Sequence, residues 1–143
     1  MSEQENSQVI QANFDALNAQ DPDTFSRLRA ADFAAEVPGV PTPLNVEQTW
    51  KFNQGYLSAF SNAHIEVTLM IAQGNYVVAH YTATGTHTGP LPTSTGSSIP
   101  ATGKKFAVKG CSTYEVKDGK ISRQWDFADM LSLFGQLGGM PPM

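Results

Sequence analysis

The sequence predicts an α+β fold in which helices cover one face of a curved antiparallel sheet, and two observations carry this prediction. Apolar residues recur at helical spacing through the first 60 residues, whereas after residue 62 the alternation changes to the period of two that is typical of half-buried strands. Such segregated elements favour helices packed on one face of an antiparallel sheet that curves around them. The 143 residues are expected to form one domain over residues 1–143, with a frayed tail at 140–143.

Three helices are expected in the N-terminal part. The first runs from about Glu5 to Ala19 and carries one apolar stripe. The segment 21–23 ends it and starts a second helix, because proline is tolerated in a first turn. A short strand over 33–37 and a proline-rich bend at 38–43 follow, after which Asn45 can cap a third helix. The apolar face of that helix consists of Val46, Trp50, Leu57 and Phe60.

Four long strands and a final helix are expected in the C-terminal part. The strands are predicted at about His64–Gln73, Tyr76–Thr88, Lys104–Val116 and Lys120–Phe127, and the helix at Met130–Leu137. Tight turns are predicted at 74–75 and 118–119. The loop between Thr88 and Gly103 is rich in Gly, Pro, Ser and Thr, and is either a mobile cover over the open end of the sheet or a surface excursion.

Composition excludes several function classes. Nine Lys and Arg residues, a net charge of −4 and no basic run argue against a nucleic-acid partner. No apolar stretch approaches the length of a membrane span, and the first residues lack the features of a secretory signal, so a cytoplasmic protein is expected. A single cysteine, Cys111, and histidines without partners at ligand spacing indicate no metal site. The low charged fraction of 15% favours a homodimer.

Five short segments of the second half occur in a characteristic order. They read GTHTG at 85–89, ATGKKF at 101–106, DGKI at 118–121, WDFAD at 125–129 and QLG at 136–138. In this order they resemble the SnoaL-like polyketide cyclases and ester cyclases of the NTF2-like superfamily. The resemblance implies a cone that encloses an apolar small molecule, and a cyclase or isomerase that needs no cofactor. In these cyclases an aspartate near the terminal strand takes a proton from an activated carbon of a carbonyl or ester compound and returns it.

Asp126 is the candidate for that aspartate. A carboxylate inside a mostly apolar cone would have its pKa raised toward the range useful for acid–base catalysis. Asp129 is the alternative, although an Asp before an apolar run is commonly a helix cap.

Three further residues are candidate partners of Asp126. Tyr81 could donate a hydrogen bond to a developing enolate oxygen, or its ring could simply fill the cone. His87 lies near the rim as a second polar helper, or as a surface histidine that satisfies the loop backbone. Glu36 could face Asp126 and push the two pKa values apart, or it could be a solvated residue before the proline bend.

The DGKI and WDFAD segments are also similar to the limonene epoxide hydrolases. That similarity implies that apolar pocket positions fall on Val108, Gly110 and Ser112. The arginine and second aspartate of those hydrolases are replaced by Tyr81 and Ala83, which argues against epoxide opening. Other candidate ligand contacts, which core packing would also explain, are Phe14, Trp50, Tyr56, Gln124 and Trp125.

Three functions compete at this level. The first is an enzyme that acts on a small apolar carbonyl or ester compound. The second is a non-catalytic protein that carries or senses an apolar metabolite, and the third is a dimeric association module. The resemblance to cyclases favours the enzyme.

Overall fold

The computed structural model describes residues 2–93 and 96–138, so the predicted frayed tail at 140–143 lies outside the described residues. The helices are α1 (Glu3–Ala19), α2 (Pro22–Arg27), α3 (Val46–Ala59) and α4 (Met130–Gln136). The strands are β1 (Arg29–Glu36), β2 (Phe60–Gln73), β3 (Tyr76–His87), β4 (Leu91–Pro92), β5 (Ser98–Ile99), β6 (Lys105–Lys117) and β7 (Lys120–Ala128). None of the described helices is long and apolar enough to span a bilayer.

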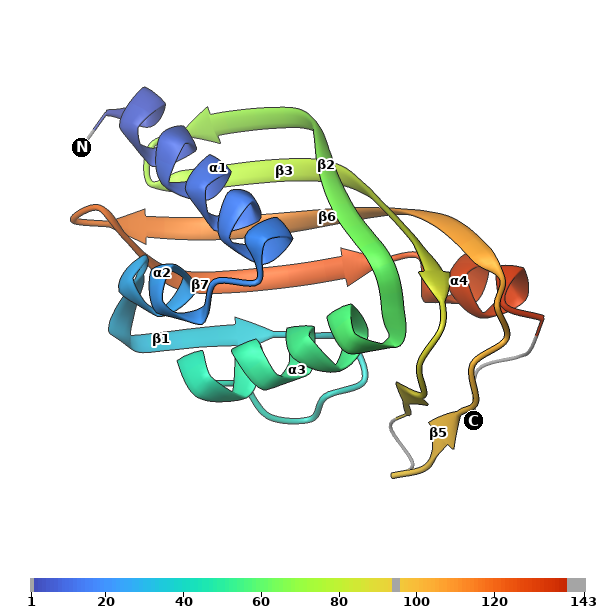
Figure 1. Cartoon of the computed structure of the whole chain (residues 1–143). Coiled ribbons are helices and arrows are strands. Elements are labelled where there is room, and N and C mark those ends of the chain that lie inside the picture. The colour runs from blue at the N-terminus through green and yellow to red at the C-terminus, as the bar shows by residue number, and fades with distance from the viewer. Residues whose placement is uncertain (1, 94–95, 139–143) are drawn as a thin grey trace.

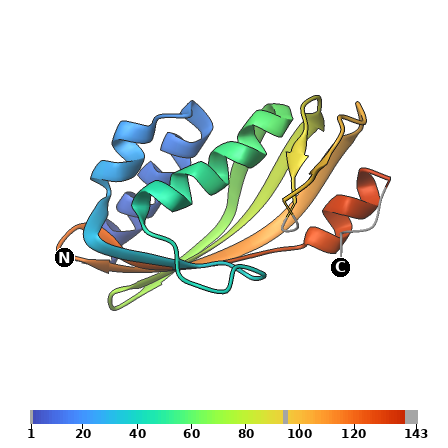
Figure 2. The same cartoon turned by 90° about the horizontal axis from the view of Figure 1, so that it is seen from below.

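One curved sheet of five strands, in the order β1-β7-β6-β3-β2, carries the fold (Figure 1). Helices α1, α2 and α3 lie on the same side of it (Figure 2). The predicted α+β class and curved sheet are therefore confirmed. The sheet is mixed, however, because β1 runs parallel to its neighbour β7 while the other pairs are antiparallel. No hairpin links β1 to β7, so chain connection does not impose the antiparallel direction on this pair.

Local capping explains where the N-terminal helices begin. Ser2 and Glu5 form a reciprocal capping box at α1, and Asn45 and Gln48 form another at α3. The side chain of Asp21 accepts a hydrogen bond from the backbone of Thr24 at the start of α2. The predicted starts of α2 and α3 are thus confirmed.

Two apolar clusters fill the space between the helices and the sheet. The first holds residues of α1, α2, β1, β3, β6 and β7, among them Ile10, Phe14, Phe25 and Tyr114. The second lies around the end of α3 and α4, and includes Phe60, Phe106 and Phe134. Leu91 of the short β4–β5 hairpin is fully buried in this second cluster. The hairpin within the predicted loop is therefore anchored at that end of the sheet.

Candidate active site

Strand register and burial together show which face of the sheet is covered by the helices. Ala79, Ser112 and Asp126 are direct partners across β3, β6 and β7, so they share one face. Ala79 is fully buried in the cluster that also contains residues of α1 and α2, so this face points inward. Tyr81 and Tyr114 lie two residues along their strands from this row and share the face. The candidate aspartate thus lies on the helix-covered face.

Asp126 is held by one donor on each carboxyl oxygen. The Ser112 hydroxyl donates to Oδ1 at 2.6 Å, and the Gln124 amide Nε2 donates to Oδ2 at 2.7 Å. Burial raises the pKa of Asp126 above its usual value, while these two hydrogen bonds and the charge of Arg29 oppose that rise. By exposed area, Asp126 as a whole residue is partly buried. The carboxyl group is therefore held in one orientation, and its pKa is shifted in the direction expected of an acid–base group.

Two phenols share this interior face. The Tyr81 ring packs on Phe14 at 5.8 Å between centroids, and the Tyr114 ring meets Phe14 edge-on at 6.3 Å. Burial is the main cause that raises the pKa of Tyr81 to about 12, and the negative charge of Asp126 is the second. The same two causes raise the pKa of Tyr114 more strongly. Both phenols therefore stay protonated at neutral pH and can donate hydrogen bonds.

Gly110 makes the position of Tyr81 possible. The two residues are direct partners between β3 and β6, and a Cβ at Gly110 would overlap the Tyr81 ring and hydroxyl. The missing side chain leaves room for the Tyr81 ring next to Gly110. Gly110 was expected to line the site, and the structure places it beneath the predicted hydrogen-bond donor.

Arg29 is a site residue that the sequence analysis missed. It begins β1 and is only 4% exposed. One guanidinium nitrogen, Nη2, donates to Gln124 Oε1 at 2.8 Å, and the other, Nη1, donates to the carbonyl of Phe25 at 3.0 Å. Desolvation lowers its pKa to about 10, so the side chain remains charged at neutral pH. An arginine at the start of an Ala-rich strand, two residues after Arg27, gave no pattern that would have identified it.

His87 and Asp129 lie outside this cluster. His87 is buried at the end of β3, where its Nδ1 lies 3.0 Å from Thr102 Oγ1 and accepts from the Thr102 backbone at 3.3 Å. Its ring also contacts Phe60 at 5.5 Å between centroids. Asp129 caps α4 by accepting a hydrogen bond from the backbone of Ser132 at 3.0 Å. The loop contact expected as the alternative for His87 is present, but the residue is buried rather than on the surface.

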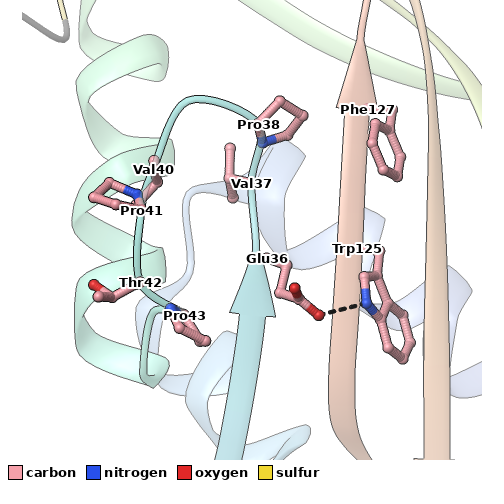
Figure 3. A pocket seen from close by; sticks show the side chains of 9 residues that line it. All are labelled: Glu36, Val37, Pro38, Val40, Pro41, Thr42, Pro43, Trp125 and Phe127. Atoms are coloured by element: carbon pink, nitrogen blue, oxygen red, sulfur yellow. Dashed lines mark hydrogen bonds between the residues drawn. The ribbon is translucent and has the colours of Figure 1, made fainter.

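Glu36 faces away from Asp126. Its Oε2 accepts a hydrogen bond of 2.6 Å from the indole of Trp125, the neighbour of Asp126 in β7 (Figure 3). Successive strand residues point to opposite faces, so the two carboxylates are on opposite sides of the sheet. The proposed pairing of Glu36 with Asp126 is therefore wrong. A surface pocket of about 280 Å³ surrounds Glu36, Trp125 and Phe127 beside the proline-rich bend.

The remaining predicted contact residues divide between the site and the core. Phe14 touches both phenols, and Gln124 binds Asp126 directly. Trp50 packs on Phe25 at 5.1 Å between ring centroids. Tyr56 lies near Phe60, and Val108 belongs to the same second cluster. The described residues include no group of three or more His, Cys, Asp or Glu side chains placed to hold a metal ion.

Helices packed on one face of a curved mixed sheet form an NTF2-like fold, and the sequence profile of the SnoaL-like polyketide cyclases matches residues 7–137. The chain therefore belongs to the SnoaL-like polyketide cyclase family. No curated protein sequence matches it.

Solved structures share the fold over nearly the whole chain. AclR of Streptomyces galilaeus, described as a candidate hydroxylase, has a TM-score of 0.84 at 24% identity and covers 98% of this chain and 100% of its own. IdmH of Streptomyces antibioticus, described as a candidate polyketide cyclase, has a TM-score of 0.82 at 26% identity over 93% and 98%. A Catenulispora acidiphila protein with a ketosteroid isomerase-like fold has a TM-score of 0.72 at 20% identity over 92% of each chain. The predicted NTF2-like fold is confirmed.

Proposed function

We propose that this protein is a cofactor-independent cyclase or isomerase of a small apolar carbonyl or ester compound, with Asp126 as its acid–base group. Family membership supports a small-molecule cyclase or isomerase. The assignment of Asp126 as the acid–base group is supported by its position. This residue is partly buried on the inner face, and Ser112 and Gln124 each bind one of its carboxyl oxygens.

The proposed reaction begins with proton transfer to Asp126. The Asp126 carboxylate takes a proton from a carbon next to a carbonyl group, and the electron pair of that C–H bond moves to the carbonyl oxygen as an enolate. Tyr81, protonated because its pKa is raised to about 12, donates a hydrogen bond to that oxygen. In a cyclisation the enolate carbon then attacks a second carbonyl of the same molecule, and Asp126 returns its proton to the new alkoxide. In an isomerisation the proton returns to a different carbon.

Deuterium exchange tests this mechanism without knowledge of the natural substrate. Small enolisable ketones and β-keto esters are dissolved in D2O, and NMR follows the loss of their α-protons with and without protein. We expect Asp126→Asn to lower the protein-dependent exchange rate by roughly 10²-fold or more, because it removes the base. Asp129→Asn is the matched control: it makes the same chemical change at a helix cap, where Asn caps equally well, and should leave the rate unchanged.

The outcome also separates the enzyme from its main alternative, a non-catalytic binding protein. That alternative is favoured by the engagement of His87 with Thr102, which leaves Asp126 with fewer polar helpers than expected. Equal exchange by Asp126→Asn and the parent would rule out Asp126 as the base. Saturable binding of the probes with no exchange above buffer would favour the binding protein.

We also propose that the protein forms a homodimer through the outer face of its sheet. Two rows of paired residues cross that face. One row is Leu69, His80, Cys111 and Phe127, and the other is Ile71, Val78, Thr113 and Trp125. Three large apolar side chains at the ends of the rows are about half exposed: Leu69 46%, Ile71 56% and Phe127 58%. Such an exposed apolar band is typical of an association surface.

A further inference from the structure

Arg29 carries a buried charge that forms no direct ion pair with a carboxylate of the described residues. The ion pairs found among the described residues are Lys51–Glu47 and Lys117–Glu115, and Arg29 takes part in neither. Its guanidinium carbon instead lies 3.5 Å from the Phe25 ring centroid and 4.9 Å from that of Phe33. Burying an arginine in this way carries a large desolvation cost.

The hydrogen bonds of Arg29 lead to Asp126 through one amide. Arg29 Nη2 donates to Gln124 Oε1 at 2.8 Å, and Gln124 Nε2 donates to Asp126 Oδ2 at 2.7 Å. A guanidinium has donors only, so it can bind only the oxygen end of the Gln124 amide. The nitrogen end must then face Asp126.

We propose that Arg29 is a positioning residue that acts through Gln124, fixing the amide as a donor to Asp126 and so keeping the carboxyl group available as a base. This inference rests on the proposed function of Asp126. A residue at the start of β1 thus influences the reactivity of Asp126 in β7.

Ser112 cannot perform the same task alone. A serine hydroxyl donates to an ionised carboxylate, but it can also turn and accept from a protonated carboxyl group. It therefore tolerates both forms of Asp126. Gln124, with its oxygen occupied by Arg29, can only donate, so it favours the ionised form. Arg29 thus makes Gln124 favour the ionised form of Asp126, and the positive charge of Arg29 stabilises that form as well.

Carbon-13 NMR titration of the Asp126 carboxyl group tests the arrangement without any substrate. Arg29→Met keeps an unbranched side chain between Phe25 and Phe33 while removing the charge and the donors. We expect it to raise the pKa of Asp126 by about one unit, and Gln124→Met to raise it by a similar or larger amount. The double variant should exceed Gln124→Met by less than the full effect of Arg29→Met, because the hydrogen-bond effect of Arg29 runs through Gln124 while only its charge acts directly on Asp126. Arg123→Met, at an exposed position of β7, removes the same charge and should leave the titration unchanged.

Three results would overturn the proposal. The first is an unchanged pKa of Asp126 in folded Arg29→Met. The second is a pair of shifts that simply add in the double variant, which would mean that Arg29 acts independently of Gln124. The third applies if Arg29→Met does not fold. In that case an unchanged pKa of Asp126 in Gln124→Met refutes the proposal.

The exchange assay keeps this proposal distinct from the function of Asp126. Folded Arg29→Met should lose exchange activity at low pH and recover it as the pH rises, since a higher pKa delays ionisation of the base. A purely structural loss would not recover with pH. If Asp126→Asn is inactive while Arg29→Met leaves the titration unmoved, the role of Arg29 fails and the proposed function stands. The reverse pattern refutes the function alone.

Discussion

At the scale of single residues, the site depends on small groups that leave room for large ones. Gly110 has no side chain where the Tyr81 ring crosses β6, and Ser112 provides a short hydroxyl that reaches Asp126 at 2.6 Å. The aromatic ring and the carboxyl group can thus share one face of the sheet. A larger residue at either position would separate the proposed hydrogen-bond donor from the proposed base.

Gly110→Ala should therefore disturb function through Tyr81. The added Cβ would overlap the Tyr81 ring, so the ring must move or the strands must part. We expect about a tenfold or greater loss of α-proton exchange, with a fall of about 1–3 kcal/mol in the free energy of unfolding. Denaturant unfolding and the exchange assay measure the two effects. Gly135→Ala is the control, because its Cβ would meet no atom of the described residues within 4 Å; equal behaviour of the two variants would contradict this role of Gly110.

At the scale of elements, α4 illustrates how a candidate site residue can instead end a strand and begin a helix. Asp129 follows β7 and accepts a hydrogen bond from the third residue of α4, Ser132. Leu133 and Phe134 of α4 are buried in the second apolar cluster. Correct initiation of this helix therefore keeps that end of the sheet covered.

Asp129→Ala should lower the free energy of unfolding by about 1 kcal/mol, the typical effect of losing an N-cap. Asp129→Asn should retain most of the stability, since Asn caps as well as Asp. Thermal or denaturant unfolding of both variants checks this prediction. A large loss of exchange activity in folded Asp129→Asn would instead reinstate Asp129 as a site residue.

The secondary structure could be predicted from the sequence more completely than the candidate site. Helix starts at Asp21 and Asn45 carry local capping signals, and alternation with turns at 74–75 and 118–119 defines the long strands. The start of β1 at Arg29 was missed, because the strand is Ala-rich and lacks alternating large apolar residues. The face of Asp126 and its link to Arg29 depend on pairing between strands far apart in sequence. Such pairing leaves no local signal, so the sequence could not decide between the two alternatives for Glu36, and Arg29 was overlooked.

At the scale of the whole molecule, the two faces of the sheet have different surroundings. Helices cover the inner face, which holds Asp126, while the outer face exposes Ile71 and Phe127. A second copy placed on the outer face would bury these side chains and leave the inner face unobstructed. The proposed dimer and the proposed active site are therefore compatible.

Charged substitutions on the outer face should convert a dimer to a monomer. Ile71→Lys combined with Phe127→Lys places two charges in the apolar band, and burying unpaired charges in an interface is strongly unfavourable. Sedimentation at micromolar concentration measures the mass of parent and variant. Leu131→Lys is the control, because Leu131 is 63% exposed on α4 rather than on the sheet. A monomeric parent would contradict the dimer.

The pKa of Asp126, measured by carbon-13 NMR titration with Asp126→Asn to assign the signal, tests the proposed role of this residue most directly. Burial is expected to hold this pKa above the ordinary value of 3.8. Since the base must be ionised, exchange activity should rise as the pH increases through that pKa. The same shift makes the folded state bind its proton more tightly than the unfolded state, so the contribution of Asp126 to stability should fall over this pH range. A pKa at or below 3.8 would show a solvated or strongly hydrogen-bonded structural carboxylate, and would contradict the assignment of Asp126 as the catalytic base.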